Sequence, residues 1–113
     1  MEDKRRQPRF HRRLGVRYQS ESGARRLAFS GDASADGVFL NSAQIEKPGR
    51  RIDLDVDLPG VGLVKLGGQV VWARRVPPPL VTVQRGGFGV RIVDAPDTWR
   101  QFFRNLESRR ATS

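Results

Sequence analysis

The sequence contains no cysteine and a single histidine, and none of its apolar runs is long. Without cysteine the chain has no disulfide, no thiolate metal site and no cysteine nucleophile. His11 stands among arginines with no carboxylate partner that the pattern places beside it, so we expect a solvated side chain. No segment approaches the ~20 apolar residues that span a bilayer, and the start of the chain lacks the apolar segment of a secretory signal. We expect a soluble, cytoplasmic protein with no membrane insertion.

Length and composition favour one small β-rich domain. The chain has 113 residues, of which 12 are glycine, 7 are proline and 37% are hydrophobic, so many turns between short strands fit better than a helical bundle. Its net charge of +9 indicates an anionic partner, such as a nucleotide, a nucleic acid, a phospholipid or an acidic protein. Residues 1–26 hold nine Lys/Arg against three Asp/Glu, a net +6 of that total. The partner is therefore expected to dock near the start of the chain.

Alternating apolar and polar residues predict six strands. The clearest is residues 51–58, where the apolar residues face one side and Asp53, Asp55 and Asp57 face the other. These aspartates lack the glycine and the closing glutamate of a calcium loop, so we interpret them as the solvated face of a strand. The other strands are expected at residues 14–18, 26–30, 38–40, 63–75 and 88–93.

The last apolar pattern is helical. Its members recur at the i, i+3, i+4, i+7 spacing of one helix face: Trp99, Phe102, Phe103 and Leu106. Asp94 is the expected N-cap, and Pro96 is tolerated in the first turn. The aromatic residues of this helix, and Trp72 in the long strand before it, are predicted to belong to the core rather than to an exposed stacking surface.

These patterns divide the chain into three parts. Residues 1–13, rich in arginine and without apolar periodicity, are predicted to form a flexible basic arm. Residues 14–108 are predicted to form a barrel with its helix. Residues 109–113 are expected to be a frayed tail.

A short arginine constellation lies within the arm. Residues 5–9 read RRQPR, with Arg5 and Arg9 four residues apart in a loop that Pro8 keeps out of helical geometry. Guanidinium groups hold phosphate through paired hydrogen bonds, stack on aromatic planes and bind the O6 and N7 edge of guanine. Taken alone, such a pair is frequent in any basic tail.

A second constellation, residues 32–37, reads DASADG. The i, i+2 spacing puts Asp32 and Ser34 on one face if the strand continues that far, and both side chains can bond a base or a phosphate. Gly37 permits a tight turn, through a positive φ, or a close approach of a ligand. Taken alone, this pattern is most often turn chemistry that ends a hairpin.

The first constellation precedes the predicted strands, and the second lies among them. Together they resemble the two-part signature of PilZ domains. The segments GVFL (37–40), GQVVWAR (68–74) and GFGVRI (87–92) also occur in that family's order, so the resemblance covers most of residues 4–106. It implies a mainly β fold: a small six-stranded antiparallel β-barrel with a basic N-terminal arm and a C-terminal α-helix. Arg9 and Arg13 share the same spacing but lack the internal proline, so Arg5 and Arg9 are preferred.

The resemblance implies that the ligand is cyclic di-GMP. On that reading Arg5 and Arg9 bind phosphates and guanine, and Arg6 assists by its charge. Asp32, Ser34 and Gly37 contribute from the barrel surface. The ligand orders the arm against the barrel and creates a surface for a downstream effector protein.

Alternative functions remain open. A small basic barrel can bind RNA or DNA through counterion release and base stacking. A degenerate PilZ domain can serve as an interaction adaptor that does not bind the nucleotide. The sequence has no triad spacing, metal cluster or phosphate-cradling loop, so we expect no enzyme activity, no metal and no cofactor.

Overall fold

The computed structural model describes residues 10–11, 13–20, 23, 25–42, 46–74 and 86–112. Within these ranges the chain forms seven strands and one helix. They are β1 (Phe10–His11), β2 (Gly15–Ser20), β3 (Arg25–Ala33), β4 (Gly37–Asn41), β5 (Arg51–Leu58), β6 (Gly62–Arg74), β7 (Gly87–Asp94) and α1 (Asp97–Thr112). The six strands predicted from alternation correspond to β2–β7, which confirms them.

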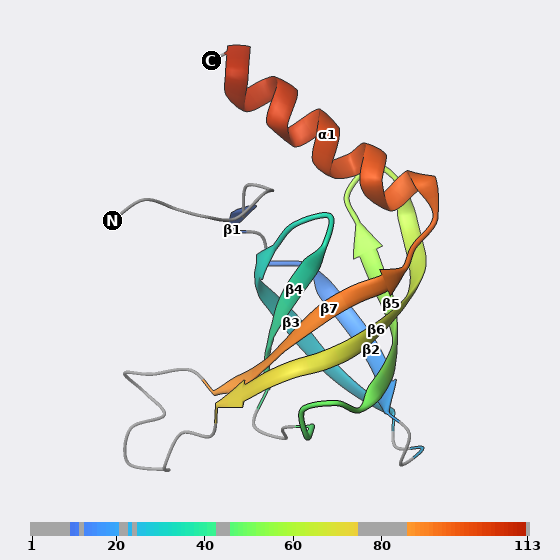
Figure 1. Ribbon diagram of the computed structural model, residues 1–113. Coiled ribbons are helices and arrows are strands. Elements are labelled where there is room, and N and C mark those ends of the chain that lie inside the picture. Colours follow the sequence, from blue (N-terminus) through green and yellow to red (C-terminus); the bar gives the residue numbers. More distant parts are fainter. Residues whose placement is uncertain are drawn as a thin grey trace, which may run out of the picture.

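The six longer strands close into an antiparallel barrel (Figure 1). Around the barrel the order is β3, β2, β5, β6, β7 and β4, and a direct β3–β4 pairing joins the two ends of the sheet. The sheet closes because β3 pairs with β2 along one edge and with β4 along the other. Phe29 pairs with Gly15 of β2 on one edge and with Asn41 of β4 on the other. The predicted mainly β, six-stranded barrel with a C-terminal helix is confirmed.

Strand β1 continues the line of β2 along the same edge of β3. Phe10 pairs with Ala33 of β3, which pairs with Val38 of β4 on its opposite edge. Between the two strands, the backbone amide of Leu14 donates to the Ser30 hydroxyl at 2.8 Å. Phe10 and His11 were expected in an unpaired arm, and this is wrong for their backbone. The sequence could not show this pairing because it joins residues more than 20 positions apart.

The core fills the barrel and continues beneath the helix. Each of β2–β7 turns apolar side chains inward, and Leu40, Val56 and Phe88 are completely buried. Helix α1 lies across one end of the barrel (Figure 1). It buries the predicted aromatic stripe there, with Trp99 fully enclosed and Leu106 at the margin. None of the described helices is long and apolar enough to cross a bilayer.

Both ends of the helix differ from the prediction. The expected N-cap, Asp94, is the last residue of β7, where it pairs with Gly67 of β6 and so remains in the ladder. The helix begins only at Asp97, and the amide of Trp99 donates to the carbonyl of Pro96 at 3.1 Å. At the other end the helix runs to Thr112, so residues 109–112, expected to be part of a frayed tail, are helical.

Tyr18 is the only tyrosine of the chain and is almost fully buried inside the barrel. Its hydroxyl lies 3.3 Å from that of Ser42, and its ring meets Phe88 edge to face. Burial raises the pKa of Tyr18 above its ordinary value of 10.0, because the phenolate would lose its hydration.

We therefore expect Tyr18 to resist ionisation in the folded protein above pH 10.0. The unfolded chain releases this proton first, so Tyr18 leaves stability unchanged below that pH and lowers the free energy of unfolding as pH rises above it. Tyrosinate absorbance, which reports Tyr18 alone, should rise only together with loss of the folded circular dichroism signal. Tyr18→Phe should flatten the alkaline fall in stability. Reversible ionisation near the ordinary pKa with the fold intact would contradict the expectation.

Candidate functional site

The second constellation forms a tight turn, residues 34–37, which we call the motif turn. The Ser34 amide donates to the Gly37 carbonyl at 2.8 Å, and the Gly37 amide donates to the Ser34 hydroxyl at 3.2 Å. The same hydroxyl lies 3.4 Å from the Gly37 carbonyl, to which it donates. Ser34 is only 7% exposed. The serine and the glycine therefore define the turn itself, as the turn interpretation of this pattern predicts.

The motif turn is held from two sides. The Asp36 carbonyl accepts from the Ile92 amide of β7 at 2.8 Å. The Ala35 carbonyl accepts from the indole N–H of Trp99 in α1 at 2.9 Å, within the buried interior. On the surface, the Asp36 carboxylate lies 3.9 Å from the Arg100 guanidinium. Strand β7 and helix α1 together fix where the turn sits at the end of the barrel.

Gly37 serves close packing rather than an unusual backbone conformation. Its φ is not positive, so the predicted left-handed turn geometry is wrong at this position. A Cβ atom at Gly37 would lie 3.2 Å from the carbonyl oxygen of Val90 on β7. The position suits glycine because β4 and β7 approach each other closely there.

The arginines of the first constellation, Arg5, Arg6 and Arg9, lie outside the described residues, as does the side chain of His11. The described chain begins at Phe10, whose Cα partner is Ala33, between Asp32 and Ser34. The Phe10 ring also contacts Phe103 of α1, with ring centroids 6.2 Å apart. The end of the arm is thus attached to β3, where the second constellation begins.

Arg13 is placed on a different part of the surface. Its guanidinium carbon lies 4.0 Å from the ring centroid of Phe29, on the outer face of β3. Phe29 is 45% exposed, so the pair forms an exposed cation–π contact. Arg13, the second member of the alternative pair, is therefore engaged with Phe29 in this structure.

We compared the chain with known protein families and with curated proteins. The chain matches the family described as PilZ domain over residues 3–107. It belongs to the PilZ domain family. No curated protein matches the chain.

Solved structures share the fold of this PilZ domain at low sequence identity. The Bacillus subtilis inhibitor of motility, MotI/DgrA, aligns at a TM-score of 0.77 and 17% identity, over 97% of this chain and 52% of that one. YcgR from Escherichia coli, in complex with c-di-GMP, aligns at 0.73 and 16%, over 97% and 47%. The MrkH–c-di-GMP complex of K. pneumonia aligns at 0.74 and 13%, over 97% and 52%. This chain therefore spans about half the length of each of these proteins.

The PilZ domain also carries a stacked aromatic pair, the half-buried Phe39 and the exposed Trp72, that strand alternation did not predict. The rings stack at 5.1 Å between centroids and 11° between planes. Trp72 is 41% exposed, so its predicted place in the core is wrong. A register shift between Val70 and Trp72 is the cause, because an extra residue in the strand reverses which side the following side chains face.

Glycine makes room for this aromatic pair. Gly89 of β7 pairs with Phe39 on one side and with Trp72 on the other. A Cβ atom at Gly89 would collide with the Trp72 indole, which covers the bare backbone there. Phe39 lies on β4 two residues after Gly37, the last residue of the motif turn. The aromatic pair is therefore close to the motif turn along this strand. Residues 87–89 read GFG, and this alternation of glycine in a strand could have indicated the aromatic pair. Glycine within a strand often marks a site where another group approaches the backbone closely.

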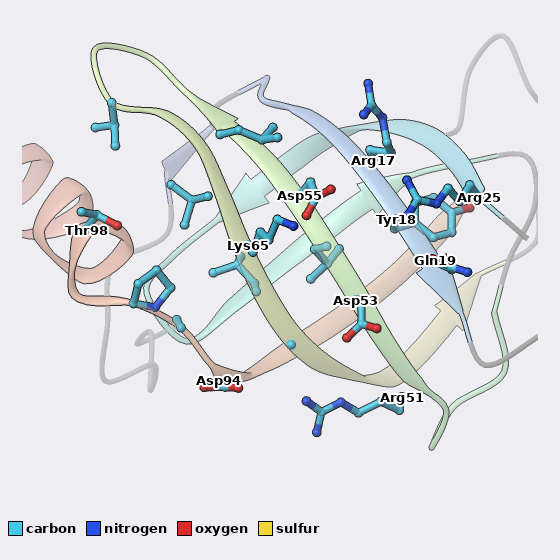
Figure 2. A pocket seen from close by; sticks show the side chains of 18 residues that line it. Arg17, Tyr18, Gln19, Arg25, Arg51, Asp53, Asp55, Lys65, Asp94 and Thr98 are labelled. Atoms are coloured by element: carbon cyan, nitrogen blue, oxygen red, sulfur yellow. The ribbon is translucent and has the colours of Figure 1, made fainter. Parts of the chain in front are cut away.

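A separate hollow of about 870 Å³ lies on the outer surface of β2, β5 and β6 (Figure 2). Across its floor, Arg17, Asp55 and Lys65 stand opposite one another on the three strands. Asp53 and Asp55 face outward, as the strand pattern predicts. None of the residues that line the hollow belongs to either binding constellation.

Gly89→Ala is expected to displace the Trp72 ring and to break its stack with Phe39. The lost aromatic contact should lower the free energy of unfolding by about 1 kcal/mol. Denaturant unfolding measures this cost, and the Trp72 contribution to fluorescence should change in the folded state. Gly15→Ala on β2 is the matched control, because a Cβ there meets nothing within 4 Å. Equal stability of the two variants would contradict the proposed role of Gly89.

Proposed function

We propose that this PilZ domain is a receptor for c-di-GMP that acts by binding alone. The ligand is bound by Arg5 and Arg9, with Arg6 assisting, and by Asp32, Ser34 and Gly37 from the barrel. The observation that carries the proposal is the pairing of Phe10 with Ala33. It attaches the arginine-bearing arm to the strand that carries Asp32 and leads into the motif turn.

Chain connectivity supports this assignment. Arg9 is bonded directly to Phe10, and consecutive Cα atoms are about 3.8 Å apart. Since Phe10 lies opposite Ala33, the Arg9 side chain can reach a ligand held at Asp32 and the motif turn. Arg5 is four residues farther along, within about 14 Å of extended chain. A ligand as large as a cyclic dinucleotide can therefore be bound by both arginines at once.

The chemistry of the two halves is complementary to this ligand. The arginines supply paired hydrogen bonds to phosphate and to the O6 and N7 edge of guanine. Asp32 is half-exposed on β3, and its carboxylate can accept from the N1–H and amino group of guanine. The Ser34 hydroxyl donates to Gly37 over a long 3.4 Å. Its hydrogen can turn toward the ligand while the oxygen still accepts from the Gly37 amide.

Relatives of known structure support the same ligand. YcgR, its PilZ domain alone and MrkH were each solved with c-di-GMP, and the YcgR PilZ domain aligns over 98% of this chain at a TM-score of 0.64. We extend the ligand to this chain because both halves of the signature are present. We further propose that the bound ligand orders the arm and that a separate effector protein binds the resulting surface in the cytoplasm.

A nucleic-acid-binding barrel is the second candidate, and one observation favours it. Phe29 and Trp72 are both exposed on the outer surface, and stacking on bases is the usual mode of single-stranded recognition. Its predicted behaviour differs from that of the receptor. Many arginines would contribute a little each, and binding would weaken steeply with salt.

Calorimetric titration of c-di-GMP into the wild type and its variants separates these functions. Wild type should bind saturably, and Arg9→Ala and Asp32→Ala should each weaken binding about tenfold or more through loss of charge-assisted bonds. Arg13→Ala is the matched control, because it removes the same charge from a side chain that lies over Phe29. It should leave the affinity nearly unchanged.

The same titrations with GMP and a short RNA, at low and high salt, complete the test. Salt-sensitive RNA binding without c-di-GMP binding would establish the nucleic-acid barrel instead. Binding of neither ligand would identify a degenerate adaptor. An equal loss in Arg9→Ala and Arg13→Ala would mean that general charge, and not the signature, holds the ligand.

Ordering of the arm is tested by hydrogen exchange. Saturating c-di-GMP should slow amide exchange in residues 3–13, because several charge-assisted bonds hold the arm against the barrel. Exchange in β5, on the far side of the sheet from the signature, serves as the internal control. Unchanged exchange in the arm at full occupancy would refute a disorder-to-order mechanism while leaving the binding itself intact.

A further inference from the structure

Among the described residues, one buried hydrogen bond joins a side chain of α1 to the motif turn. The indole N–H donates to the Ala35 carbonyl at 2.9 Å, and Trp99 is 0% exposed. The bond is therefore shielded from bulk water. The Ala35 carbonyl lies in the middle of the turn that aligns Ser34 and Gly37.

The same helix contacts the other half of the site. Trp99 packs edge to face on Phe103 at 4.8 Å, and Phe103 contacts Phe10 at 6.2 Å. Phe10 is the residue directly after Arg9, and its partner Ala33 is two residues before Ala35. Trp99, Phe103 and Phe10 thus form a continuous aromatic bridge between the motif turn and the attachment point of the arm.

We infer that Trp99 is a positioning residue of the nucleotide site, acting through the Ala35 carbonyl, and that α1 couples the two halves of that site. The inference rests on the proposed function. Without the indole N–H, a buried carbonyl has no donor, and the turn rotates to find one. That rotation moves Ser34 and Gly37 out of register with Asp32, and ligand affinity falls even though the barrel remains folded.

The coupling is reciprocal. If the Trp99 hydrogen bond favours the binding-competent turn, the ligand must in turn favour the Trp99 hydrogen bond, because the linkage free energy is the same in both directions. Binding of c-di-GMP should therefore stabilise the Trp99 hydrogen bond of α1, although α1 is distant in sequence from both signature segments. The helix, rather than the barrel wall, is then the part of the domain that responds to the ligand.

The test compares Trp99→Phe with two controls by calorimetric titration of c-di-GMP, well below the melting temperature of each protein. Trp99→Phe keeps an aromatic ring but removes the donor, and should weaken binding about tenfold, the effect of one lost buried hydrogen bond. Leu106→Ala similarly reduces the packing of α1, but Leu106 lies at the margin of the core, beside the β5–β6 turn. Arg100→Ala removes only the exposed ion pair to Asp36. Both controls should bind as wild type does.

Each outcome decides the question. Weakened binding in Trp99→Phe alone supports the inference. Wild-type affinity in Trp99→Phe overturns it and leaves the receptor function standing. An equal loss in Leu106→Ala at equal thermal stability also overturns it, since general loosening of α1 would explain the effect. Failure of the wild type to bind c-di-GMP removes the proposed function, and the inference with it.

A measurement on the wild type covers the case in which Trp99→Phe does not fold. The indole N–H of Trp99 gives its own proton resonance, distinguished from that of Trp72 by the spectrum of Trp72→Phe. Saturating c-di-GMP should slow exchange of the Trp99 indole proton and of the Gly37 amide together. Unchanged exchange at both sites in the ligand-bound protein would overturn the coupling.

Discussion

Closure of the sheet through β3 is the constraint on which the rest of the molecule depends. This strand pairs with β2 and β1 along one edge and with β4 along the other, so the six-stranded barrel has no open edge between its first and last strands. A closed sheet satisfies its own backbone hydrogen bonds within the ladder. Because β3 extends past β2, its far end is where the arm, the motif turn and the helix meet.

The inner and outer faces of the barrel differ in how their side chains pack. Inward residues are apolar and pack into one core, and the helix aromatics extend that core across the end of the barrel. The outer surface over β4, β6 and β7 instead pairs bare glycine backbone with flat aromatic rings, as where Trp72 covers Gly89. At the end of the barrel covered by α1, buried hydrogen bonds hold the backbone. The motif turn is the clearest case, since its backbone groups are bonded within the turn, to β7 and to α1.

Most of the fold could be predicted from local patterns, and the errors have identifiable causes. Alternation located the strands because the side-chain period of two is a local property. It misplaced Trp72 because a register shift in β6 reverses the phase after Val70. It chose Asp94 as a helix cap because the sequence does not show that a ladder partner, Gly67, holds that residue in β7. Phe10 was assigned to a free arm for the same reason, since its partner on β3 is distant in the chain.

Residue types available for binding, and segments with strand or helix periodicity, can be recognised from the sequence alone. Both halves of the PilZ signature are contiguous short motifs, so their chemistry is also evident from the sequence. How the two halves are brought together depends on contacts that form only in the folded chain. The Ala35 carbonyl is bonded by a tryptophan 64 residues later, and the arm is tied to Ala33 by strand pairing. Such contacts depend on barrel closure and on the path of α1 across its end, and local sequence patterns carry no information about either.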